Sequence, residues 1–329
     1  MEAGTLRAGG RSILERSPRA RAADPILRWV LTGLAALILV LIAFFFVRLF
    51  VEAKPAFDKF GYFGFTFDNN WDVSHATFGA WPLLVGTLLT SAIALLIGVP
   101  VAIATALYIS ELCPRRIRQP LTILVELLAA VPSVVYGLWG IKVLAPKLEP
   151  AEQWFSDKFS FLPLVGGPVS IPNCFIAGLI MAIMILPIVS AISREVMATV
   201  PPQDKEGALA LGATRWEMIR IAVLPYSRAG ISGAAMLGLG RAIGETIAVT
   251  IVIGNAPNVP HTIFSQGYTL AAVIANEFNE AASDPTHRAA LIAAGLVLFV
   301  LTLIVNAIAR SYVNRAARGA RAVPQGMAG

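Results

Sequence analysis

Six long runs of apolar residues limit what this chain can fold into. Each run is about 20 residues long, which is the length of an α-helix that crosses the hydrocarbon core of a bilayer. Because that core offers no water for hydrogen bonding, a crossing segment must pair its backbone groups internally, as a helix does. The runs are Ile26–Val47, Leu83–Ile109, Leu121–Ala145, Pro172–Ser193, Ala229–Gly254 and Ala289–Ala309. The sequence therefore predicts an all-α integral membrane protein with six transmembrane helices.

The composition excludes the other broad classes of protein. Hydrophobic residues make up 57% of the chain and charged residues only 14%, too few for the polar surface of a soluble domain of this size. The same figures exclude intrinsic disorder. The two cysteines, Cys113 and Cys174, are too few for a disulfide scaffold or a structural zinc site.

The basic residues predict how the chain is oriented in the membrane. Most of the 26 Lys and Arg residues lie in the N-terminal arm, in the connections between runs two and three and between runs four and five, and in the C-terminal tail. Basic residues are retained on the cytoplasmic side, so we expect both termini there. The domains are then a cytoplasmic arm at 1–25, a transmembrane domain at 26–313 and a cytoplasmic tail at 314–329. Because topology accounts for the net charge of +6, nucleic-acid binding is not supported.

The cytoplasmic connection at 194–228 carries folding signals of its own. Pro201 and the proline after it would end the fourth transmembrane helix. A short helix is expected next, with Gly212 placed to end it in a left-handed conformation. Thr214 and Glu217 have the spacing of a capping box, which opens a second helix. The sequence thus predicts a helix, a glycine corner and a second helix. We expect Pro225 to end that second helix.

The same loop resembles the EAA motif of ABC importer permeases. The residues that carry the resemblance are Glu206, Gly207, Ala208, Gly212, Leu224 and Pro225. Two positions depart from the motif, because Gly207 replaces its first alanine and Ala222 stands where isoleucine is usual. The resemblance implies that the loop holds a coupling helix, which inserts into a cleft of a separate ATPase subunit. The folding signals alone are equally those of an ordinary cytoplasmic helical hairpin.

The predicted fifth helix carries two charges inside the membrane. Arg241 lies about 18 Å along the helix from the start of the run, and Glu245 follows one turn later on the same face. Such residues face a bundle interior or a water-filled path. The two are therefore a structural ion pair or a gate or anion step on a translocation path. Gly240 and Gly244 form a G-x-x-x-G pattern, which predicts close packing of this helix.

Segments from three different spans together resemble one family of permeases. They are Phe78–Pro82 with Gly86–Leu88, Ala130–Gly137, and Leu239–Thr246 with Ile253–Asn255. They resemble the PstC family, the permease subunits of phosphate-specific ABC importers. The resemblance implies a type I ABC importer permease with a MetI-like bundle, in the inner (plasma) membrane of a bacterium. It also implies that Arg241 and Glu245 occupy positions important for phosphate passage.

The resemblance also implies the partners of the chain. These are a PstA-like permease subunit, a PstB-like ATPase dimer and a PstS-like phosphate-binding protein, with inorganic phosphate as cargo and membrane lipid around the helices. The chain has no G-x-x-x-x-G-K-[ST] loop, so ATP would be used by the partner ATPase. We expect that this chain binds no cofactor or metal and is not an enzyme.

Two alternatives remain at the level of sequence. The cargo could be sulfate or molybdate, because permeases for other oxyanions share the coupling loop and one arginine does not distinguish tetrahedral anions. A secondary transporter is the other alternative, although such carriers are expected to show repeats and interrupted helices in matching halves. A separate expectation concerns the aromatic residues crowded between Phe57 and Trp71, which would form an interfacial belt or a docking surface for the binding protein.

Overall fold

The computed structural model describes residues 18–321, with side chains at 25–311. The chain divides into two compact units, Met1–Val51 and Glu52–Gly329. The expected cytoplasmic arm at 1–25 and tail at 314–329 fall almost entirely outside the described side chains. The first unit contributes most of helix α1 (Pro18–Phe60), whose apolar side chains from Ile26 to Val47 are exposed.

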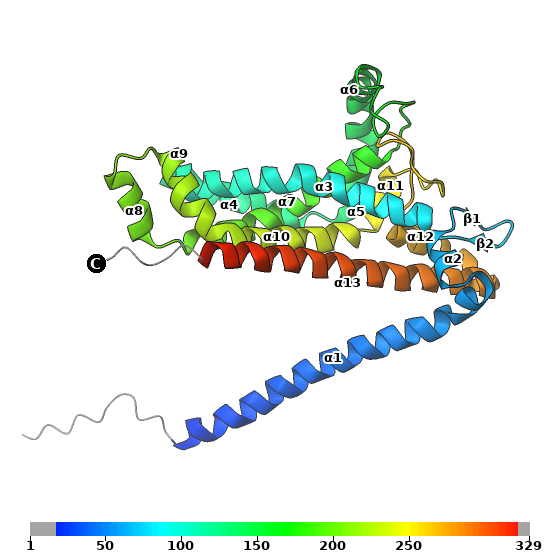
Figure 1. Ribbon diagram of the computed structural model, residues 1–329, viewed down its shortest axis with the longest axis horizontal. Helices are drawn as coiled ribbons and strands as arrows, with labels where there is room; N and C mark the ends of the chain where they lie inside the picture. The colour runs from blue at the N-terminus through cyan, green and yellow to red at the C-terminus, as the bar shows by residue number, and fades with distance from the viewer. Residues whose placement is uncertain (1–17, 322–329) are drawn as a thin grey trace, which may run out of the picture. The chain divides into compact units, whose positions relative to one another are not determined.

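The second unit is a helical bundle with a small β hairpin (Figure 1). Its long helices are α3 (Trp81–Leu107), α4 (Arg115–Ala130), α7 (Cys174–Ala198), α10 (Leu224–Ile243) and α13 (Pro285–Arg321). The hairpin end holds α2 (Tyr62–Phe67), β1 (Trp71–Asp72), β2 (Thr77–Phe78), α12 (Leu270–Glu277) and the 3₁₀ turn η4 (Glu280–Ser283). Three π turns extend helices, namely η1 (Tyr108–Leu112), η2 (Gly140–Leu144) and η3 (Ile219–Val223). The remaining helices are α5 (Ser133–Trp139), α6 (Ala145–Lys158), α8 (Pro202–Ala210), α9 (Arg215–Met218) and α11 (Ile247–Val252).

The structure is consistent with the expected six spans, but two of them are not single continuous helices. Within residues 18–321, four helices are long and apolar enough to cross a membrane: Pro25–Phe60, Trp81–Leu112, Cys174–Ala198 and Pro285–Ser311. The third predicted span is instead a pair of helices, Arg115–Ala130 and Ser133–Lys158, bent by 91°. The fifth predicted span is also interrupted, because α10 ends at Ile243 and α11 begins at Ile247.

Proline explains the first interruption. Pro132 has no backbone N–H and restricts the residue before it to extended conformations. Accordingly, Val131 (φ −69°, ψ 127°) and Pro132 (φ −59°, ψ 140°) are both extended. Pro132 thus kinks the chain sharply enough to turn it through about a right angle.

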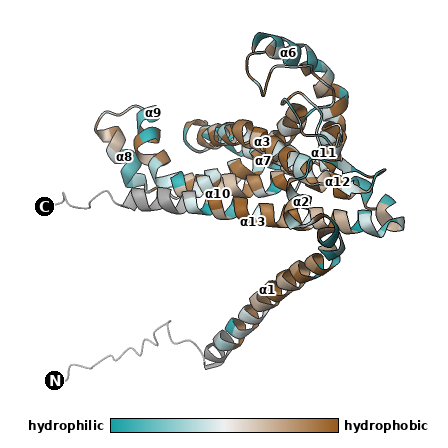
Figure 2. Ribbon diagram, turned by 45° about the vertical axis from the view of Figure 1, so that its right-hand side comes forward, coloured by the Kyte–Doolittle hydropathy of each residue, from teal (hydrophilic) through white to brown (hydrophobic). Residues whose placement is uncertain are grey.

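Small residues allow α3 and α7 to pack closely at the centre of the bundle. A methyl group at Gly178 would overlap Ile93, and one at Gly98 would meet Ile185. The main apolar core lies around this contact and includes buried residues of α3, α7, α10 and α11. Figure 2 shows hydrophobic residues along α3 and α13, whereas hydrophilic residues gather on α6 and at the α8–α9 hairpin.

Some of the aromatic residues before α3 form a small core, while Tyr62, Phe63 and Phe67 are exposed. Phe65 is fully buried, Trp71 is 3% exposed, and their rings meet edge to face. Glu277 accepts a hydrogen bond from Trp71 Nε1 at 3.1 Å and contacts His287 Nε2 at 2.9 Å. These side chains therefore join the β hairpin to α12 and α13. Neither of the two expected roles describes the buried members of the group.

Candidate functional site

The α8–α9 hairpin follows the folding signals read from the sequence. Helix α8 begins directly after Pro201, which is extended, and ends at Ala210. Gly212 has φ +87°, the left-handed conformation that glycine adopts without strain. Its N–H donates to the Leu209 carbonyl at 3.0 Å, and Ala213 N–H donates to the Ala208 carbonyl at 3.2 Å. The predicted glycine corner is confirmed.

The capping box that opens α9 is also confirmed. The Glu217 N–H donates to Thr214 Oγ1 at 3.3 Å, and Glu217 Oε2 accepts from the Thr214 N–H at 2.7 Å. The Thr214 hydroxyl donates to the same carboxylate oxygen at 2.8 Å. These hydrogen bonds from Thr214 favour the ionised carboxylate and lower the pKa of Glu217.

The expectation that Pro225 ends the second helix was wrong. The chain continues as a helix from α9 through the π turn η3 into α10, in which Leu224 and Pro225 are the first residues. In the π turn the Leu224 N–H bonds to the Ile219 carbonyl, so the hydrogen-bond pattern has already left the α-helical register before the proline. Pro225 lies in the first turn of α10, where its missing backbone N–H removes no α-helical hydrogen bond.

The hairpin has one buried and one exposed face. Ala208 is buried with Met218 and Ile219 in a second apolar cluster, which also includes residues of α3 and α7. On the other side Glu206 and Gly207 are exposed. Large apolar side chains are exposed as well, above all Leu211 (92%) and Trp216 (60%). An apolar surface on a polar hairpin is typical of a protein–protein contact.

Arg241 and Glu245 do not pair as expected. The expectation assumed a continuous helix, but Arg241 is in the last turn of α10 and Glu245 lies beyond its end. Glu245 Oε1 instead accepts a hydrogen bond from the Ala248 N–H, at 3.3 Å, at the start of α11. Among the described residues Arg241 has no ion-pair partner within this chain, and its side chain is exposed.

The two interrupted spans meet beside Arg241. Helices α5 and α11 pack against each other, and Gly137 leaves room for Ala248 and Ile251. Tyr136, which interacts electrostatically with Arg241, donates its hydroxyl to the Leu128 carbonyl at 2.7 Å, across the bend at Pro132. Tyr136 had no predicted role, although it lies in one of the segments that carry the family resemblance.

Gly240 and Gly244 make no close helix contact with the part of the chain that the structure describes. Nothing lies within 4 Å of a methyl group placed at Gly240, and such a group at Gly244 would meet only the Gly240 carbonyl. Helix α10 instead approaches α7 at Gly230 and Gly238, where a methyl group would overlap Val196 and Val189. The packing role of the G-x-x-x-G pattern stays a prediction, for a contact with another subunit.

Comparison with known proteins defines the class. Residues 98–318 match the family of binding-protein-dependent transport system inner membrane components. The fold is also that of a solved bacterial ABC transporter involved in the import of the acidic polysaccharide alginate, with a TM-score of 0.57 at 19% identity, over 90% of this chain and 99% of that one. The chain is thus a multi-pass membrane component of an ABC importer and is not itself an enzyme.

More similar relatives narrow the class. The phosphate transport system permease protein PstC of Mesorhizobium japonicum is 43% identical over 297 residues, which cover 89% of this chain and 90% of that protein. The PstC protein of Pasteurella multocida is 44% identical over 79% of this chain and 83% of its own length. The chain belongs to the PstC family.

Proposed function

We propose that this chain is the permease subunit of an ATP-driven importer of inorganic phosphate. The observation that carries the proposal is its likeness to PstC proteins over most of both chains. The proposed assembly contains a PstA-like second permease, a PstB-like ATPase dimer and a PstS-like phosphate-binding protein. ATP is used by the ATPase, and this chain holds no cofactor.

The α8–α9 hairpin is the proposed contact with the ATPase. It combines a rigid shape, fixed by Gly212 and the capping box at Thr214, with exposed apolar side chains at Leu211 and Trp216. Glu206 adds a charge on the same element. With the hairpin and both termini in the cytoplasm, docking of the loaded binding protein would take place at the opposite end of the bundle, beside the β hairpin.

Arg241 is the proposed phosphate contact on the path. Its guanidinium offers donors in a planar fork that fits a phosphate oxygen pair. Because the carboxylate of Glu245 bonds to α11 instead, no ion pair among the residues that the structure describes neutralises Arg241. In a membrane interior an uncompensated charge faces an aqueous path or a partner. Glu245 is proposed to line the same path.

The test is uptake of labelled phosphate in cells that lack this gene and carry wild type or Arg241→Gln. We expect uptake with wild type, no competition by excess unlabelled sulfate, and loss of uptake in Arg241→Gln with the complex still assembled. Arg228→Gln is the matched control, because Arg228 is exposed at the start of the same helix. Competition by sulfate or molybdate would mean that the cargo is another oxyanion and not phosphate alone. Loss of the assembled complex in Arg241→Gln would indicate a structural role for Arg241.

A further inference from the structure

One ion pair joins the α8–α9 hairpin to the end of α3. Lys205 Nζ in α8 lies 2.7 Å from Glu111 Oε1, although 94 residues separate the two in sequence. The side chains are 21% and 8% exposed respectively. The carboxylate is thus withdrawn from water, and loss of its partner would leave a nearly buried, uncompensated charge.

The surroundings hold Glu111 in place. It belongs to the π turn η1, which extends α3, and π turns inside helices recur at functional sites. The Ser110 hydroxyl donates to the same carboxylate oxygen at 2.9 Å, and Arg118 Nη2 donates to the Ser110 carbonyl at 2.9 Å. The Glu111 carboxylate is therefore held by residues at the end of α3 and in α4, independently of Lys205.

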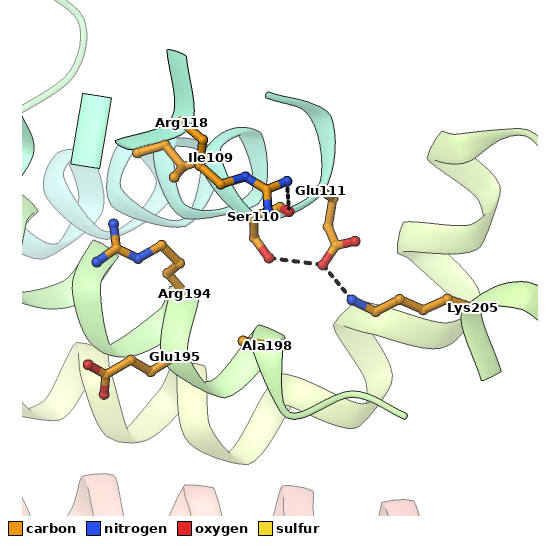
Figure 3. A pocket seen from close by; sticks show the side chains of 8 residues that line it. All are labelled: Ile109, Ser110, Glu111, Arg118, Arg194, Glu195, Ala198 and Lys205. Atoms are coloured by element: carbon orange, nitrogen blue, oxygen red, sulfur yellow. Dashed lines mark hydrogen bonds and ion pairs between the residues drawn. The ribbon is translucent and has the colours of Figure 1, made fainter. Parts of the chain in front are cut away.

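The pair lies at one side of a cavity of about 360 Å³ between η1, α4, α7 and α8. Figure 3 shows Lys205 extended toward Glu111, whereas Arg194 and Glu195 point away from the pair. Arg194 is engaged elsewhere, with Thr122 at 2.7 Å and Glu126 at 2.9 Å. Glu111 and Lys205 are thus specific partners rather than two members of a diffuse charge cluster.

Helix α8 packs against α9 and η3, and Ala208 is its one buried residue. Among the described residues, Glu111–Lys205 is the ion pair that joins α8 to the end of α3. Helix α3, in contrast, runs the length of the bundle. Near its other end, Thr87 Oγ1 accepts a hydrogen bond from the Leu270 N–H at the start of α12, at 3.0 Å. A displacement of α8 that reached Glu111 would therefore be carried by one helix to the far side of the molecule.

We propose that the Glu111–Lys205 ion pair makes α8 and the end of α3 move as one unit, so that movement imposed on the hairpin reaches the transmembrane bundle. The proposal rests on the ATPase contact proposed above for the hairpin. Glu111 and Lys205 act as positioning residues, since neither needs to touch cargo or nucleotide. Without the pair, the α8–α9 hairpin would still bind the ATPase, but its movement would no longer be passed directly to α3.

The experiment uses the complete complex in proteoliposomes and compares wild type, Glu111→Gln, Lys205→Gln and the double variant. The measured quantity is phosphate taken up per ATP hydrolysed, together with the amount of ATPase that co-purifies. We expect each single variant to lower the ratio about ten-fold, within the usual range of coupling between sites, with the ATPase retained. The double variant should be no worse than either single one, because both remove the same interaction.

Glu195→Gln is the matched control, because Glu195 lines the same cavity but makes no ion pair within the described residues. Its ratio should equal that of wild type. A wild-type ratio in both single variants, additive losses in the double variant, or equal losses of ATPase binding and uptake would each overturn the proposal. If a single variant fails to assemble, the test uses a variant that combines Glu111→Lys with Lys205→Glu and so exchanges the two charges. Restoration of the uptake ratio in that variant would support the ion pair, whereas assembly without coupling would refute it.

Failure of the proposed function gives a different result. In that case the wild-type complex takes up no phosphate, while stimulation of its ATPase by the loaded binding protein still measures coupling. Loss of that stimulation in Glu111→Gln, with the ATPase bound, would support the ion pair whatever the cargo, and full stimulation would refute it.

Discussion

Arg241 is in the last turn of α10, whereas Glu245 lies in the break between α10 and α11, and its carboxylate accepts a hydrogen bond from the Ala248 N–H at the start of α11 instead of pairing with Arg241. The two charges therefore have separate roles. Glu245 fixes the start of the short helix α11. Arg241 is exposed, so its positive charge is available to an ion on the path or to a partner subunit.

Separate roles predict that substitutions at the two positions act independently. Arg241→Gln should reduce uptake to background, whereas Glu245→Gln, which keeps an acceptor oxygen for the Ala248 N–H, should retain most of it. Loss of that acceptor in Glu245→Ala should cost about 1 kcal/mol of stability. Uptake by the single and double variants measures the independence. Equal and non-additive losses in Arg241→Gln and Glu245→Gln would show that the two charges do act as a pair.

Gly212 and Gly207 provide a matched comparison within the hairpin. Neither has a neighbour within 4 Å of an added methyl group, but only Gly212 has a positive φ, of +87°. Gly212→Val should therefore be strained by about 1–2 kcal/mol from conformation alone and should reduce both ATPase co-purification and coupled uptake. Gly207→Ala replaces a glycine inside α8 and should stabilise that helix by about 1 kcal/mol. Normal coupled uptake in Gly212→Val would remove the hairpin from the proposed contact.

The capping box predicts a dependence of the hairpin on pH. Hydrogen bonds from Thr214 lower the pKa of Glu217 in the folded protein, so the ionised carboxylate stabilises the start of α9. That stabilisation is present above the pKa of an unfolded glutamate, about 4.3, and is lost as the pH falls through the lower, folded value. Hydrogen exchange of the α9 amides between pH 7 and pH 3 should show progressive loss of protection at the acidic end.

Glu217→Gln is the control for this pH dependence, because a glutamine does not titrate. At pH 7 the α9 amides of this variant should exchange faster than those of wild type. At pH 3 the exchange rates of variant and wild type should be similar. An identical pH profile in wild type and variant would mean that another group governs the stability of the hairpin.

The α8–α9 hairpin was predictable because its signals are local. Gly212 and the pair Thr214 and Glu217 satisfy backbone groups within a few residues, and the sequence alone specifies such caps. The bend at Pro132 was predictable for the same reason. The break after Gly244 was not, since glycine is common inside transmembrane helices and no proline follows it. The contact between Glu111 and Lys205 depends on how α3 and α8 pack, which no local pattern records.

The contact between the two interrupted helices gives a final prediction. A methyl group at Gly137 would lie 3.1 Å from Ala248 Cα and 3.0 Å from Ile251 Cδ1, and the backbone atom cannot move aside as a side chain can. Gly137→Ala should push α5 away from α11, shift Tyr136 relative to Arg241 and lower phosphate uptake. Gly233→Ala in α10 is the control, because nothing lies within 4 Å of its added methyl group and both changes raise helix propensity alike. Equal uptake by the two variants would show that transport does not depend on close packing at Gly137.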